Sequence, residues 1–91
     1  MLEVYGRRVQ GLKVDLPMAP LLVIVAPRGY VMCGYLDITV AERLGQAAAV
    51  VKGVKNFADV LKGKVAAATS EAKKIGVSEG MLGIDALRKM I

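Results

Sequence analysis

The stretch LLVIVAPRGYVMCGYL, residues 21–36, decides the fold of this chain. It holds two apolar runs, 21–26 and 30–36, whose β-branched and aromatic residues are typical of strands. Pro27, Arg28 and Gly29 between them fit a type I turn followed by a glycine bulge, which predicts a β-hairpin. Neither run alternates polar and apolar residues, so we expect a central hairpin that is covered on both faces.

The residues before this hairpin predict a second, half-exposed one. Residues 2–5 and 9–16 alternate apolar and polar side chains, most clearly at 12–16, and a turn at Gly6, Arg7 and Arg8 joins them. The segment 16–20 contains two prolines, which cannot donate to a sheet and which fix φ, so it is expected to be a connection.

The second half changes to helical spacing. Asp37 is expected to cap a short helix that ends at Gly45, and Asn56 is expected to cap another. Residues 57–75 fit either one kinked helix or two elements, and residues 65–69 alone also fit a strand. The remaining predicted elements are a fifth strand at 46–51 and a last helix at 83–90.

Together these elements predict one domain over residues 1–91, an α+β fold with an antiparallel sheet of about five strands and helices packed mainly on one face. So small a domain buries only about 60–65% of its surface. Yet 55% of its residues are hydrophobic and its mean hydropathy is +0.48. Its helices can cover one side of the central hairpin, so we expect the other side to meet a second copy in a homo-oligomer.

The composition excludes several classes of chemistry. The chain has no histidine, so it cannot build a Ser-His, Cys-His or His-ligated metal site by itself. One cysteine cannot form an internal disulfide. We therefore expect no metal and no cofactor. No apolar stretch approaches the roughly 20 residues of a membrane span, and the start does not resemble a signal peptide, which predicts a cytoplasmic protein.

The charge is uneven. The net charge is +5, and residues 52–91 carry eight basic and four acidic side chains against five and four in residues 1–51. A basic half can attract nucleic acid, but lysines and arginines spread over so many residues are more typical of a solvated helical surface. The sequence also lacks a nucleic-acid-binding motif, so this interpretation remains an alternative.

Two places could hold a site. Cys33 is either a small buried hydrophobe or a nucleophile, which would need a nearby cation or helix N-terminus to activate it. Gly34 would allow a ligand to approach closely, and Asp37 marks the helix start nearby. The glycines of Gly80-Met81-Leu82-Gly83 could either expose backbone N–H groups to an anion or permit a turn and close helix packing.

The segments 29–37 and 80–87 resemble the YunC-like family, a small bacterial and archaeal domain of unknown function. The resemblance extends from about Pro20 to the end of the chain, and Met32-Cys33-Gly34 with the following Leu36-Asp37 is its more specific motif. The family's late motif usually continues Gly-Arg-Glu-Ala-Leu, whereas this chain has Ile84-Asp85 in place of Arg-Glu. An anion-binding role that depends on that arginine therefore does not carry over. The resemblance implies no established activity.

These observations leave three hypotheses. The first is a homo-oligomeric domain that binds a small anionic ligand near Cys33 and Asp37, with Gly34, Gly80 and Gly83 as further ligand-binding residues. The second is a thiol-dependent enzyme that uses Cys33. The third is a nucleic-acid-binding protein that uses the basic second half.

Overall fold

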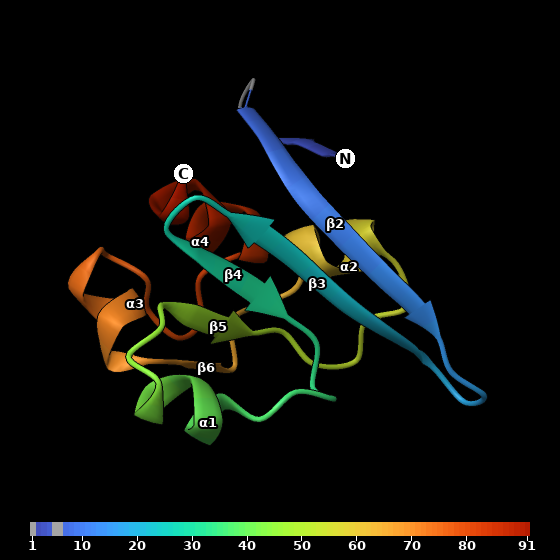
Figure 1. Cartoon of the computed structure of the whole chain (residues 1–91). Helices are drawn as coiled ribbons and strands as arrows, with labels where there is room; N and C mark the ends of the chain where they lie inside the picture. Colours follow the sequence, from blue (N-terminus) through green and yellow to red (C-terminus); the bar gives the residue numbers. More distant parts are fainter. Residues whose placement is uncertain (1, 5–6) are drawn as a thin grey trace.

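Six strands and four helices follow one another along residues 2–4 and 7–91, which this computed structural model describes, with side chains from Val9 onward (Figure 1). The strands are β1 (Leu2–Val4), β2 (Arg7–Asp15), β3 (Pro20–Ala26), β4 (Gly29–Met32), β5 (Ala48–Val50) and β6 (Ala67–Ala68). The helices are α1 (Ile38–Arg43), α2 (Phe57–Lys62), α3 (Ser70–Lys74) and α4 (Gly83–Met90).

The strands form one sheet in the order in which they occur in the chain, β1-β2-β3-β4-β5-β6. The α+β class is as predicted, but the sheet is mixed, so the prediction of a purely antiparallel sheet is wrong. β4 and β5 are parallel, with Val31 opposite Ala49. The reason is the connection between them. The chain leaves β4 at one edge of the sheet, passes through α1 and returns to the opposite edge before β5 begins, so the two strands run in the same direction.

The predicted central hairpin is present, but its turn differs. Ala26 pairs with Gly29, so only Pro27 and Arg28 form the loop, and Gly29 is not among the glycines with positive φ. No glycine bulge is formed. Gly29 is needed for a different reason, since a Cβ there would lie 2.6 Å from the carbonyl oxygen of Ala47, where the parallel strand β5 approaches.

Two other strand predictions need correction. β4 ends at Met32 rather than at residue 36, because residues 34–36 turn away from the sheet. Arg7 and Arg8, expected in a turn, belong to β2, while the Gly6 part of that turn lies outside the described residues. The rest of the N-terminal hairpin is confirmed by the antiparallel pairing of β1 with β2.

The helix starts follow the sequence closely. Asp37 accepts a hydrogen bond from the Thr39 amide, and Asn56 accepts one from the Asp59 amide, both at 2.8 Å. The structure also decides between the alternatives for residues 57–75, which contain two helices, α2 and α3, separated by the short edge strand β6. The hypothesis of a strand within residues 65–69 is therefore confirmed.

The two faces of the sheet are covered unequally. On one face, Leu22, Ile24 and Val31 pack with side chains from α2, α3 and α4 in the larger core. On the other face a smaller core includes Val23 and Ala41, the latter from α1. Helices therefore lie mainly on one face, and α1 covers part of the other (Figure 1).

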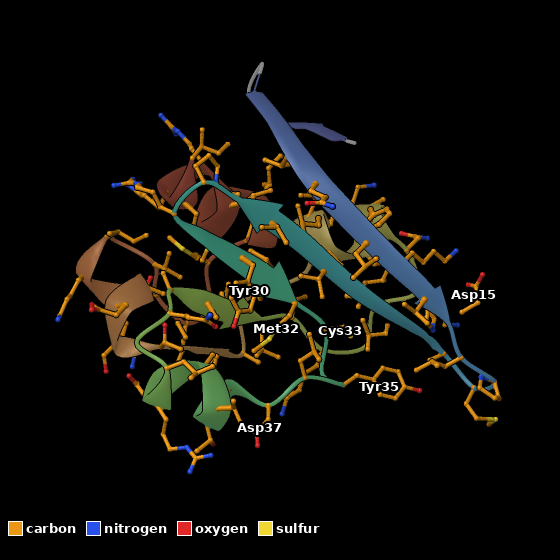
Figure 2. All side chains as sticks on the ribbon, in the orientation of Figure 1. Asp15, Tyr30, Met32, Cys33, Tyr35 and Asp37 are labelled. Carbon is orange, nitrogen blue, oxygen red and sulfur yellow. The ribbon has the colours of Figure 1, made fainter. Side chains whose placement is uncertain are left out.

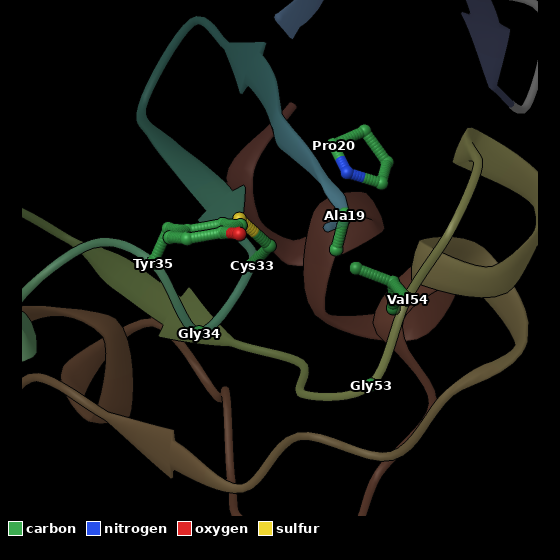
Figure 3. A pocket seen from close by; sticks show the side chains of 7 residues that line it. All are labelled: Ala19, Pro20, Cys33, Gly34, Tyr35, Gly53 and Val54. Carbon is green, nitrogen blue, oxygen red and sulfur yellow. The ribbon is translucent and has the colours of Figure 1, made fainter. Parts of the chain in front are cut away.

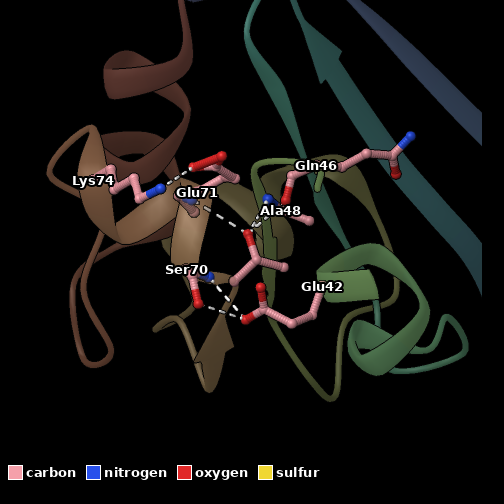
Figure 4. A network of polar contacts seen from close by, with 8 residues as sticks. Glu42, Gln46, Ala48, Ser70, Glu71 and Lys74 are labelled. Carbon is pink, nitrogen blue, oxygen red and sulfur yellow. Dashed lines mark hydrogen bonds and ion pairs between the residues drawn. The ribbon is translucent and has the colours of Figure 1, made fainter. Parts of the chain in front are cut away.

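A buried threonine fastens β5, α3 and the loop after α1 (Figure 4). Thr69 is 1% exposed, and its hydroxyl donates to the Gln46 carbonyl at 2.7 Å. The same oxygen accepts from the amides of Ala48 at 3.0 Å and Ala72 at 3.3 Å. In a continued β5–β6 ladder the Ala48 amide would donate to the Thr69 carbonyl. That carbonyl instead accepts from the Lys73 amide in α3, so the Ala48 amide donates to the Thr69 hydroxyl.

Candidate functional site

The candidate site lies where β4 and β5 end. The carboxyl ends of parallel strands meet at one edge of a sheet, and ligands often bind in open α/β sheets at such an edge. Here β4 leads into Cys33, Gly34, Tyr35 and Asp37, and β5 leads into Val51 and Lys52. Figure 2 shows Cys33, Tyr35 and Asp37 along the segment that leaves β4.

Cys33 has a structural role at the end of the hairpin. Its amide donates to the Leu22 carbonyl at 3.0 Å, as in an antiparallel ladder, but its own carbonyl accepts from the Leu36 amide at 3.3 Å. The Leu22 amide therefore donates to Sγ of Cys33, also at 3.3 Å. The residue is 2% exposed and packs in the larger core. This arrangement accounts for a cysteine at position 33 without catalysis, and no observation favours the thiol enzyme.

A small apolar cavity lies beside Cys33 (Figure 3). We call it the Cys33 hollow; its volume is about 230 Å³, and its lining is Ala19, Pro20, Cys33, Gly34, Tyr35, Gly53 and Val54. None of these side chains carries a charge, and Figure 3 shows Cys33 and Tyr35 on either side of Gly34 in the lining. The hollow suits an apolar group and offers no cationic side chain to bind an anion.

A larger cavity lies on the other side of Gly34 and Tyr35. This Lys52 hollow has a volume of about 390 Å³ and is lined by Gly34, Tyr35, Leu36, Asp37, Ile38, Val50, Lys52 and Ala67. Gly34 lies beside the stem of Lys52, and a Cβ at Gly34 would be in ordinary van der Waals contact with Cγ of that lysine, at 3.5 Å. The hollow thus combines one cation, one carboxylate and an apolar floor.

The two charged side chains of the Lys52 hollow, Asp37 and Lys52, form few interactions with the described residues. No ion pair or hydrogen bond of the Lys52 side chain is found among residues 9–91. One oxygen of Asp37 is occupied by the Thr39 amide. Asp37 and Lys52 therefore line the same space without pairing, so both can turn toward a bound molecule.

The structure does not bring Gly80 and Gly83 to this corner, since neither lines the two hollows. Their amides donate to the carbonyls of Val65 and Gly63, both at 2.8 Å. Gly80 has a φ of 89°, and a Cβ at Gly83 would overlap the carbonyl oxygen of Val60 in α2. The two glycines therefore serve a turn and the close packing of α4 on α2, and we leave them out of the proposed site.

Part of the positive charge of the basic half is paired with carboxylates. Lys73 pairs with Glu79 at 3.8 Å and Lys74 with Glu71 at 3.1 Å, both at or near α3. These pairs partly neutralise the α3 surface, as expected of a solvated helix. No observation favours nucleic-acid binding.

Among residues 9–91, two groups near α1 have shifted pKa values, the Tyr30 phenol and the Glu42 carboxyl. Partial burial raises the pKa of the Tyr30 phenol, whose oxygen donates to Gln46 at 2.6 Å. Hydrogen bonds from the hydroxyl and the amide of Ser70 lower the pKa of the Glu42 carboxyl, at 2.8 and 3.0 Å (Figure 4). Glu42 thereby joins α1 to the start of α3.

Lys52 is the site residue that sequence reasoning missed. The available signal was its position as the first charged residue after the buried run 48–51. With β4 and β5 taken as antiparallel, their ends would lie at opposite edges, which would separate Lys52 from Asp37. A helix between two buried runs predicts the parallel pairing that brings them together.

The described residues form a small α+β domain with a mixed sheet and with two hollows at the ends of β4 and β5. Among the described residues no cluster of three or more Cys, Asp or Glu side chains could hold a metal ion, and no helix is long and apolar enough to cross a membrane. The chain belongs to the family described as a domain of unknown function, DUF1805, whose model matches residues 32–90.

Two relatives extend this similarity to almost the whole chain. The uncharacterized protein YunC of Bacillus subtilis is 31% identical over 90 residues, which cover 94% of this chain and 89% of that protein. The crystal structure of TA1206, a protein of unknown function from Thermoplasma acidophilum, is 39% identical and superposes with a TM-score of 0.93. The superposition covers 99% of this chain and 88% of that one.

Proposed function

We propose that the domain binds a small molecule in the Lys52 hollow through an anionic group and an apolar body. The observation that carries this proposal is a cavity of about 390 Å³ whose lining combines the apolar side chains of Leu36, Ile38 and Val50 with Lys52, a lysine that has no ion-pair partner among residues 9–91. Small-molecule sites are typically apolar cavities with a few polar groups that fix the ligand's orientation.

The parts of the hollow have distinct roles in this proposal. The Lys52 ammonium binds the anionic group, and Gly34 lies beside the stem of that lysine. The free oxygen of Asp37 accepts from a donor on the ligand, which also disfavours ligands with two anionic groups close together. Tyr35, which is 51% exposed, lies at the rim between the two hollows. The proposal is one of binding and assigns no reaction.

The test uses three probes of one size, butyrate, butanol and butylammonium, titrated into the protein and followed by amide chemical shifts. We expect butyrate to shift the signals of Gly34, Tyr35 and Lys52 saturably, and the other two probes to shift them less. Lys52→Gln should abolish the butyrate response and Lys52→Arg should retain it. Lys55→Gln, an exposed lysine outside the lining, is the control.

The result that contradicts the proposal is equally specific. If butanol gives the same shifts as butyrate, or if Lys52→Gln binds butyrate as well as Lys55→Gln does, the ammonium does not recognise an anion here. If no probe shifts these signals saturably, the hollow is not a binding site for ligands of this chemistry.

A further inference from the structure

One face of the β2–β3 hairpin is largely apolar and only partly covered; its polar member is Gln10, which lies opposite Val25. Leu12 lies opposite Val23, Val14 opposite Leu21, and Val25 opposite Tyr30, and residues directly opposite each other share a face. We call these side chains the open face: Leu12, Val14, Leu21, Val23, Val25 and Tyr30. Leu12 is 50% exposed, Val14 42% and Val25 40%. Figure 1 shows α2 and α4 behind β2 and β3, and no described helix in front of them.

The helix α1 lies on this same side of the sheet, at one end of the open face. Its Ala41 packs with Val23 and Met32. Val40 and Leu44, one helical turn apart, are 41% and 65% exposed. They line a cavity of about 260 Å³ together with Tyr30 and Met32, so the apolar side of α1 continues the open face as a wall.

The dimensions show that this side of the sheet lacks a helix. A helix is about 10 Å wide with its side chains, and neighbouring strands are about 4.8 Å apart, so one helix covers about two strands. α1 occupies the part over β5 and the adjoining end of β4, which leaves β2 and β3 open. A second helix of the same size and with the same apolar stripe would fill the open part.

The named side chains of the open face are uncharged, so two copies can be placed face to face without burying a charge. Lys13 and Asp15 alternate with Leu12 and Val14, so they point to the opposite face, where they form an ion pair at 3.7 Å. Leu12, Val14, Val25, Val40 and Leu44 are each 40–65% exposed, and burying them with their neighbours on two copies removes on the order of 1,000 Å² from water, about the least that an interface between proteins requires. An apolar patch of several hundred Å² is among the largest that monomers expose, and such patches are often functional.

From these observations we propose that two copies of this chain associate through the open face, with α1 of each copy over β2 and β3 of the other. A two-fold axis makes the two halves of such an interface identical, so each copy supplies the helix that the other lacks. The proposal does not depend on ligand binding, because Leu12 and Leu44 line neither the Cys33 hollow nor the Lys52 hollow.

The test measures molar mass by light scattering over a range of protein concentrations. We expect twice the 9.6 kDa of one chain for the wild-type protein. Leu12→Lys and Leu44→Glu each place a charge on an exposed position of the interface and should reduce the mass to that of one chain. Leu82→Glu, an equally apolar position that is 40% exposed at the start of α4, should leave the dimer intact. Circular dichroism shows whether each variant is folded.

Mixing the two variants tests the arrangement itself. In a dimer of Leu12→Lys with Leu44→Glu, one half of the interface joins the new ammonium to the new carboxylate, and the other half is wild type. Equimolar mixing should therefore restore the dimer mass. A wild-type protein that is monomeric at every concentration, or variants that all stay dimeric, would overturn the proposal. Monomeric variants that do not recombine would overturn the placement of α1, and dissociation by Leu82→Glu would show that the effect is not specific to this face.

Discussion

Replacing Thr69 by valine should destabilise the domain more than replacing it by serine. Valine keeps the shape of threonine but has no hydroxyl, so the buried amides of Ala48 and Ala72 lose the oxygen that accepts from both. Each buried N–H without a partner costs about 1–3 kcal/mol, which gives a loss of about 2–6 kcal/mol. The Gln46 carbonyl loses a donor as well.

Serine provides the matched control. Thr69→Ser keeps the hydroxyl and removes one methyl group, which costs about 1 kcal/mol. We therefore expect the order of stability wild type, Thr69→Ser, Thr69→Val. A hydrophobic contribution alone would give the reverse order for the two variants, because valine buries more apolar surface than serine.

Urea unfolding at one fixed protein concentration measures the difference, since an oligomer's stability depends on concentration. With an m-value of about 1 kcal/mol/M, a gap of about 2 kcal/mol between the variants separates their midpoints by about 2 M. A serine variant that unfolds at the same urea concentration as the valine variant, or earlier, would refute the assignment of these hydrogen bonds as the dominant contribution of Thr69.

Two other predictions concern packing and charge. Gly83→Ala should lower the free energy of unfolding in urea by about 3 kcal/mol, because the new Cβ overlaps the Val60 carbonyl oxygen. Gly80→Ala is the control: its Cβ meets no atom within 4 Å, so it should lower that free energy by only about 1 kcal/mol, the cost of the positive φ. Equal losses would show that α4 moves freely away from α2. The lowered pKa of Glu42 predicts a stabilisation that is present above the ordinary carboxyl pKa and is lost as the pH falls through the folded-state value. The Tm of the wild type should exceed that of Glu42→Gln at neutral pH and converge with it in acid, and a constant difference across this range would contradict the role of Ser70.

The elements that local chemistry determines were predictable from the sequence. Asp37 and Asn56 cap helices because their short side chains accept from amides two or three residues later, and this pattern is visible in any sequence. Apolar runs likewise identified β3 and β5. Whether β5 runs parallel or antiparallel to β4 could not be predicted from either run alone, because it depends on where α1 returns the chain to the sheet.

Two glycines show what the sequence leaves open. Gly29 was assigned to a bulge, and Gly83 to either an anion site or close helix packing, and both allow another backbone to approach, at Ala47 and Val60 respectively. A glycine that turns the chain and a glycine that admits a neighbour are identical in sequence. Only the tertiary contacts distinguish them, and the same contacts bring Lys52 to Asp37.

The sulfur of Cys33 gives the domain a natural reporter of its own fluctuations. Because that atom accepts from the Leu22 amide and its residue is only 2% exposed, a disulfide reagent reaches it when the end of the β3–β4 hairpin or the lining of the Cys33 hollow opens. The rate of thiol exchange in native conditions therefore measures how often this edge opens, and its dependence on denaturant distinguishes a local excursion from unfolding of the whole chain. The Lys52 hollow lies beside the same edge, so a molecule bound there should slow the exchange.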